Sequence, residues 1–252
     1  MSISERIESR LGSKPEVQLR RWAWVVHLFT ASGTVWAFLG ILAIQGHQWR
    51  LLFLWMGIAL LVDGFDGTLA RLLGVEDRLP QFDGSLLDNI VDFLTYVFVP
   101  AFFVFEAGMV PRGFGFLSAC AILLSSAYQF CQCDAKTDDH FFKGFPSMWN
   151  AVVMYLFLLS PNPWVNMLVL WTCTMLVFVP TKYVHPYRVR YRRKITVTVI
   201  GLWSLVLLVV VLTYPDYPVW LVWASLGAVA YYVGISVAAS RKAQSLPSGT
   251  DA

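Results

Sequence analysis

Four aspartates in a stretch that interrupts an otherwise apolar chain are the residues best suited to chemistry. Asp63 and Asp66 are three positions apart, and Asp88 and Asp92 are four apart, so each pair can share one side of a helix. Carboxylates are costly in a bilayer, and four close together would repel one another and take up protons. Mg²⁺ or Mn²⁺ relieves this repulsion, because both prefer oxygen ligands and bridge carboxylates to phosphates. The pattern predicts a two-metal centre that holds a phosphate or diphosphate.

Small residues and one arginine accompany these aspartates. Gly67, Ala70 and Gly84 leave space through which a substrate can approach the helix backbone, although close helix packing uses the same small residues. Arg71 can pair with a phosphate or orient an aspartate. These positions fit a substrate site as well as they fit helix packing.

The complete pattern contains eight fixed positions: Asp63-x2-Asp66-Gly67-x2-Ala70-Arg71, then twelve residues, then Gly84-x3-Asp88-x3-Asp92. It resembles the signature of the CDP-alcohol phosphotransferases, membrane enzymes that displace CMP from a CDP-linked alcohol. The long interval resembles one bacterial subgroup, the phosphatidylcholine synthases, which join CDP-diacylglycerol to free choline. Segments 26–33 and 138–150 resemble that subgroup too. The resemblance therefore implies these two substrates and a homodimer in the lipid membrane.

The same resemblance implies a role for each motif residue. The ligands of two divalent cations, Mn²⁺ or Mg²⁺, would be Asp63, Asp66, Asp88 and Asp92. The CDP site would be lined by Asp63, Gly67, Ala70, Arg71 and Gly84. Asp88 and Asp92 would be catalytic, with Asp92 as the general base, since choline's hydroxyl is protonated at neutral pH and needs a positioned proton acceptor. No Ser/His or Cys/His pairing stands out, so we expect direct displacement without a covalent enzyme intermediate.

The composition excludes an ordinary soluble domain, because 57% of the residues are hydrophobic and only 14% are charged. The apolar runs have helical length and lack the alternation of barrel strands. We therefore expect an all-α polytopic membrane helical bundle with eight transmembrane helices, in one domain over residues 21–240. The expected spans are 22–44, 51–72, 84–105, 114–130, 147–160, 164–180, 195–213 and 219–239.

The basic residues predict the orientation of this bundle. With both termini inside, all but Arg50 and Arg112 of the 19 lysines and arginines fall on the cytoplasmic side. This places the aspartates at the cytoplasmic face, and the subgroup resemblance implies a bacterial inner membrane. The basic loop 182–194 can attract an anionic lipid or simply reflect topology. It is too short for nucleic-acid binding, which we do not expect.

The two ends of the chain differ from the apolar spans. Residues 1–20 carry apolar side chains at a spacing of four among charged ones, which fits either a short interfacial helix or a solvated tail. Residues 241–252 are mostly small and polar, and we expect a disordered cytoplasmic tail.

Choline cannot donate an N–H hydrogen bond, so a site for its quaternary amine needs aromatic faces. Aromatic residues at membrane interfaces often serve only as anchors. The candidates at cytoplasmic ends of spans, in the order in which they occur, are Trp149, Asn150, Tyr155, Tyr183 and His185.

Two other functions compete with this interpretation. The acceptor can instead be serine, inositol or glycerol phosphate, and a phosphorylated acceptor would need extra cations beside the metals. A cation or proton transporter can also use intramembrane carboxylates, but it would place them near the bilayer midplane with exits on both sides.

Overall fold

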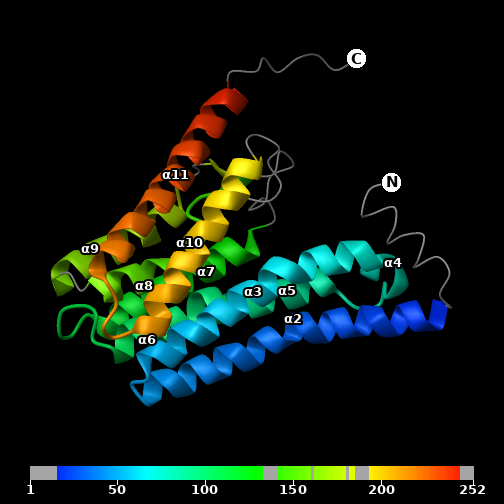
Figure 1. Ribbon diagram of the computed structural model, residues 1–252, viewed down its shortest axis with the longest axis horizontal. Helices are drawn as coiled ribbons and strands as arrows, with labels where there is room; N and C mark the ends of the chain where they lie inside the picture. The colour runs from blue at the N-terminus through cyan, green and yellow to red at the C-terminus, as the bar shows by residue number, and fades with distance from the viewer. Residues whose placement is uncertain (1–15, 133–140, 160–161, 180–181, 185–192, 245–252) are drawn as a thin grey trace. The chain divides into compact units, whose positions relative to one another are not determined.

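The computed structural model describes residues 16–132, 141–159, 162–179, 182–184 and 193–244. Within these ranges the chain is helical apart from connecting segments and two short strands (Figure 1). It divides after Val99 into two units, and the boundary falls inside a continuous helical run, Gly84–Glu106. The single membrane domain expected over residues 21–240 stays a prediction.

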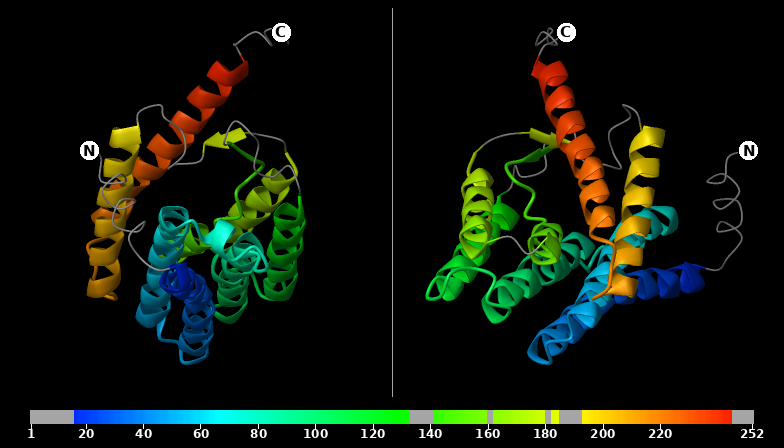
Figure 2. Two further views of the ribbon diagram at one scale, coloured as in Figure 1. Left: turned by 90° about the vertical axis from the view of Figure 1, so that its right-hand side faces the viewer. Right: turned by 60° about the vertical axis from the view of Figure 1, so that its left-hand side comes forward.

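The first unit contains the elements that carry the aspartates. They are α2 (Glu16–Gln45), α3 (Trp49–Leu73), α4 (Val75–Arg78), α5 (Gly84–Asp92) and the π-helical turn η1 (Phe93–Phe98). The long helices α2 and α3 lie side by side in Figures 1 and 2 and are joined by a tight turn. Helix α3 ends at Gly74, whose φ of 54° is a left-handed conformation that glycine adopts at little cost.

Glycines on α2 allow the helical run Gly84–Glu106 to approach closely. A Cβ at Gly33 would collide with Cγ1 of Val91, and one at Gly40 would lie 3.2 Å from Cγ1 of Val99. Small residues let helix backbones pack tightly in membranes, where van der Waals contact contributes much of the association. This contact fixes α5, and with it Asp88 and Asp92, against α2.

The second unit contains the other helices of the described residues and a two-stranded ladder. The elements are α6 (Val99–Glu106), α7 (Gly115–Cys131), β1 (Phe141–Lys143), α8 (Trp149–Leu159), α9 (Pro163–Val177), β2 (Lys182–Val184), α10 (Arg193–Thr213) and α11 (Val219–Gln244). Strands β1 and β2 pair antiparallel, with Phe142 opposite Tyr183. Helices α10 and α11 lie side by side (Figures 1 and 2). The sequence did not predict the ladder, because three-residue strands carry too little alternation to be recognised.

Within the part of the chain that the structure describes, four helical segments are long and apolar enough to cross a membrane: Glu16–Gln45, Trp49–Leu73, Gly84–Glu106 and Ile195–Thr213. Four shorter apolar helices are Gly115–Cys131, Trp149–Leu159, Pro163–Val177 and Val219–Ile235. These segments overlap the eight expected spans, so helical structure is confirmed over most of each, although residues 147–148 and 178–179 at the ends of two expected spans are not helical. The number of crossings and the orientation stay predictions.

The ends of the described chain differ in part from the sequence-based boundaries. Helix α2 already begins at Glu16, so residues 16–20 of the expected interfacial segment belong to this long helix. Helix α11 reaches Gln244, so residues 241–244 are helical rather than part of a tail. The remainders of both segments lie outside the described residues.

Candidate metal centre and active site

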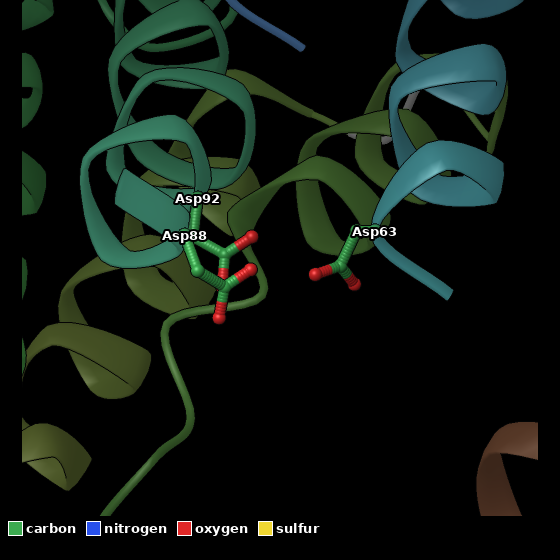
Figure 3. A group of neighbouring side chains, drawn as sticks. All are labelled: Asp63, Asp88 and Asp92. Atoms are coloured by element: carbon green, nitrogen blue, oxygen red, sulfur yellow. The ribbon is translucent and has the colours of Figure 1, made fainter. Parts of the chain in front are cut away.

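Three of the four motif aspartates meet in the first unit. Asp63, Asp88 and Asp92 each offer a carboxylate oxygen, and these oxygens lie within 4.8 Å of one another. Figure 3 shows Asp88 and Asp92 together on α5, with Asp63 on α3 facing them. All three are partly buried. Converging carboxylate oxygens are the donors that hard divalent cations prefer, so this group, the aspartate triad, can bind such a cation.

The connection between α3 and α5 is an ordered segment. It includes α4, and Leu79 is fully buried in a cluster with Ala23, Val26 and Val75. Arg78 donates from Nη1 to the backbone oxygens of the C-terminal end of α3, including Gly74 at 3.2 Å. A cation there complements the helix dipole. The twelve-residue interval between Arg71 and Gly84 therefore contains a short helix that packs against α2.

Asp83 starts α5 and so helps to orient the second pair of carboxylates. Its side chain accepts a hydrogen bond of 2.9 Å from the backbone N–H of Leu86, which is the usual way an aspartate caps a helix N-terminus. Asp88 and Asp92 follow at a spacing of four, so both stand on the same side of α5.

Asp66 is separate from the triad. It is buried, accepts the backbone N–H of Gly67, and lies beside Thr30 of α2. Positions three apart on a helix differ by about 60° in direction. Asp63 can therefore face α5 while Asp66 contacts α2, and the structure brings only three of the four expected ligands together.

The other motif residues lie around these carboxylates in different environments. A Cβ at Gly67 would have only Arg71 Nη1 within 4 Å, at 3.4 Å, so the space beside Gly67 is otherwise open. Arg71 is exposed and donates to Thr68 Oγ1 at 3.3 Å. Ala70 packs against the buried cluster of α2 and α4. Open space beside a glycine and an exposed guanidinium is the arrangement that an anionic substrate needs.

Gly84 is enclosed, unlike Gly67. A Cβ at Gly84 would lie 2.8 Å from Cε1 of His27. The His27 ring is buried and packs against Phe82, with ring centroids 4.4 Å apart. Gly84 is therefore required at least for the packing of α5 on α2, whatever else it contacts.

Sequence reasoning missed two residues that touch the motif aspartates. Tyr96 donates from its hydroxyl to Oδ2 of Asp63 at 2.7 Å, and Thr30 of α2 lies beside Asp66. Tyr96 follows Asp92 at the same spacing of four that separates Asp88 from Asp92, and that repeat could have found it. Thr30 lies on another helix and leaves no signal in the motif.

The residues expected to bind choline lie in the second unit. Most of their polar side-chain atoms that the structure describes are hydrogen-bonded. Trp149 is fully buried and donates from Nε1 to Ser126 Oγ at 2.7 Å. The Tyr155 hydroxyl is 2.7 Å from Ser225 Oγ and accepts from Trp203 Nε1 at 2.8 Å.

Asn150 is buried as well, and its Oδ1 accepts the backbone N–H of Ala151. Tyr183 belongs to β2, but its side chain lies outside the described residues, as does the whole of His185. Trp149, which is fully buried, presents no exposed face to a ligand in this conformation.

Comparison with known proteins decides the family. Residues 23–133, which contain the entire motif, match the family model described as CDP-alcohol phosphatidyltransferase. A phosphatidylcholine synthase from Pseudomonas aeruginosa is 41% identical over 215 residues, covering 84% of this chain and 90% of that relative. The chain belongs to the CDP-alcohol phosphatidyltransferase family. As a member of this transferase family it is an enzyme, which decides against the transporter interpretation.

Other relatives of this CDP-alcohol phosphatidyltransferase carry the same description. A phosphatidylcholine synthase from Mesorhizobium japonicum is 45% identical over 181 residues, which cover 72% of this chain and 68% of the relative. Another from Legionella pneumophila is 41% identical over 235 residues, covering 88% and 91%. The similarity thus extends well beyond the motif.

Proposed function

We propose that the protein transfers the phosphatidyl group of CDP-diacylglycerol to the hydroxyl of free choline, giving phosphatidylcholine and CMP. The observation that carries the proposal is the aspartate triad inside the matched family region. Relatives named phosphatidylcholine synthase that align over most of both chains support choline as the acceptor.

The triad would hold a divalent cation, Mn²⁺ or Mg²⁺, and Asp63 would share a second cation with Asp66. A carboxylate has about four lone-pair positions, so the hydrogen bond that Asp66 accepts from Gly67 leaves room for a metal. When bound, the cations stabilise negative charge on the diphosphate and on the departing CMP. Arg71 would bind the diphosphate, and Gly67, Ala70 and Gly84 would line the CDP site.

Asp92 would act as the general base and Asp88 would help to hold the reacting groups. The choline oxygen forms a bond to the phosphorus that stays with diacylglycerol, and the bond from this phosphorus to the CMP oxygen breaks. The hydroxyl proton moves to the Asp92 carboxylate and from there to solvent. Only one displacement is needed, so no residue has to form a covalent intermediate.

Choline would be recognised by residues of the second unit, among which Trp149 is our first candidate, followed by Asn150, Tyr155, Tyr183 and His185. A quaternary amine is attracted to aromatic faces. Because Trp149 is fully buried, it would have to repack when choline binds, or it would act by supporting other side chains.

The helices and the family indicate a membrane protein. We further propose that the eight apolar helical segments all cross a bacterial inner membrane, with both termini and the metal centre on the cytoplasmic side. The distribution of lysine and arginine supports this orientation. In this arrangement choline and CMP would exchange with the cytoplasm, while CDP-diacylglycerol would arrive from the lipid. The protein would work as a homodimer.

The acceptor is tested by supplying isotopically labelled choline, serine, inositol or glycerol 3-phosphate to purified protein with CDP-diacylglycerol and Mn²⁺. We expect label in the lipid fraction with choline alone, in a product whose mass equals that of phosphatidylcholine. Labelled lipid from serine, inositol or glycerol 3-phosphate, with none from choline, would overturn the acceptor assignment while preserving the family.

A further inference from the structure

Tyr96 links the two helices that form the metal centre, although it is outside the eight-position motif. Its hydroxyl donates a 2.7 Å hydrogen bond to Oδ2 of Asp63 on α3. Tyr96 itself lies on the helical run that carries Asp88 and Asp92. One helical run therefore provides two carboxylates of the triad and also the hydrogen bond that holds the third.

The backbone at Tyr96 is not α-helical. Residues Phe93–Phe98 form the π-helical turn η1, directly after Asp92. In an α-helix every step of four residues drifts by about 40° around the axis. A π turn contains more residues and offsets that drift, and such turns are frequent at functional sites. The turn thus brings Tyr96 back towards the direction of Asp88.

Thr95 supports the widened turn. It is buried, and its hydroxyl donates to the carbonyl oxygen of Val91 at 3.0 Å. Threonine hydroxyls in helices commonly bond the carbonyl four residues earlier and bend the helix locally. The position of Tyr96 is therefore built into the helix rather than left to side-chain rotation alone.

A tyrosine hydroxyl in an apolar helix is costly unless it is hydrogen-bonded. Here a carboxylate oxygen accepts that bond, and bonds to charged acceptors are the stronger kind. A phenylalanine ring would be enough to fill the space at position 96. The hydroxyl adds a fixed orientation for Asp63, because one lone pair of Oδ2 is occupied and the others remain for a cation.

We propose that Tyr96 is a positioning residue that orients the Asp63 carboxylate for divalent cation binding. This inference rests on the proposed function, since it assumes that the triad binds the catalytic metal. Tyr96 contacts Asp63 and not the reacting atoms. Groups that hydrogen-bond a metal ligand typically change metal affinity or activity by about 10–100-fold when removed.

The test is Tyr96→Phe in the full-length protein, with Mn²⁺ binding measured by electron paramagnetic resonance in the absence of substrate. We expect Mn²⁺ to bind about 10–100-fold more weakly. The Mn²⁺ concentration for half-maximal CMP release should rise in parallel, while the KM for choline stays within about twofold of the wild-type value.

Tyr217→Phe is the matched control, because it also removes a single hydroxyl hydrogen bond, the one to the Leu158 carbonyl oxygen. It should leave Mn²⁺ affinity unchanged. Thermal unfolding in EDTA separates a structural role from positioning: a structural role would lower the melting temperature of Tyr96→Phe with normal Mn²⁺ affinity. That result, or equal Mn²⁺ affinity in Tyr96→Phe and wild type, would overturn the inference.

A double-mutant cycle tests whether Tyr96 acts through Asp63. In an Asp63→Asn background, adding Tyr96→Phe should change the remaining Mn²⁺ affinity by less than about twofold, because the partner is already altered. If the loss of Mn²⁺ affinity in the double variant equals the product of the losses in the two single variants, Tyr96 does not act through Asp63. The proposed function fails separately, if wild-type protein binds Mn²⁺ yet transfers nothing to choline.

Discussion

Gly33 of α2 and Val91 of α5 are packed so closely that a side chain at position 33 has no room: a Cβ there would collide with Cγ1 of Val91. Val91 is the neighbour of Asp92 in the sequence, and α3, which carries Asp63, also packs on α2. The contact between Gly33 and Val91 therefore determines how closely α5, which carries Asp88 and Asp92, can approach α3.

Gly33→Ala should move α5 and weaken catalysis at the triad. Overpacking of a tight contact costs about 1–3 kcal/mol, and we expect at least a tenfold loss of choline-dependent CMP release together with a lower melting temperature. Gly57→Ala is the matched control, since nothing lies within 4 Å of a Cβ on that α3 glycine. Equal behaviour of the two variants would show that the contact is not needed.

Asp92→Asn should abolish turnover while CDP-diacylglycerol still binds. An amide cannot accept the choline proton, and loss of general base catalysis typically costs about 10²–10⁴-fold. The measurements are single-turnover CMP release and binding of labelled CDP-diacylglycerol. Asp77→Asn, on the exposed face of α4, serves as the control. Near-normal turnover of Asp92→Asn would remove Asp92 as the base.

The separation of Asp66 from the triad gives a prediction for metal stoichiometry. EDTA should stop the reaction and added Mn²⁺ or Mg²⁺ should restore it. Titration should find about two Mn²⁺ per chain in the wild type and about one in Asp66→Asn, because the triad is left intact. A single Mn²⁺ in both proteins would contradict a second site that uses Asp66.

Gly84 and His27 should be energetically coupled. Gly84→Ala brings a methyl group to 2.8 Å from His27 Cε1, so we expect lower stability and at least a tenfold loss of activity. In the double variant Gly84→Ala/His27→Ala the clash is removed, and part of the stability should return. Additive losses of stability would mean that Gly84 is needed for a reason other than this packing.

Trp149→Phe tests the expected choline region. The variant keeps an aromatic ring but loses the N–H bond to Ser126, and we expect a several-fold increase in the KM for choline with little change in the KM for CDP-diacylglycerol. Trp171→Phe removes the equivalent bond to Ser118 in the same unit and should change neither. An unchanged KM for choline in Trp149→Phe would show that the Trp149 N–H bond does not contribute to choline binding.

The sequence predicted the helices and most of the centre because both depend on short-range spacing. Apolar runs of helical length identify spans, and the four-residue spacing of Asp88 and Asp92 places them on one face. The spacing could not show that Asp66 contacts Thr30, since that depends on which helix lies opposite. It also could not reveal the π turn that carries Tyr96, because hydrophobic patterns do not distinguish it from an α-helix.

The choline residues show the other limit of sequence reasoning. The sequence makes Trp149 a choline candidate because it begins a predicted span at the predicted cytoplasmic side, where aromatic residues commonly meet water and head groups. Tertiary packing buries it completely and pairs its N–H with Ser126. Position along a span predicts depth in the membrane, but not whether a side chain faces lipid, ligand or another helix.

Choline-dependent release of CMP from CDP-diacylglycerol by the purified protein is the most direct test of the proposed transfer. With Mn²⁺ present, we predict CMP and phosphatidylcholine in equal amounts, none of either without choline, and none from Asp88→Asn. CMP release that is independent of choline, or undiminished in Asp88→Asn, would contradict it.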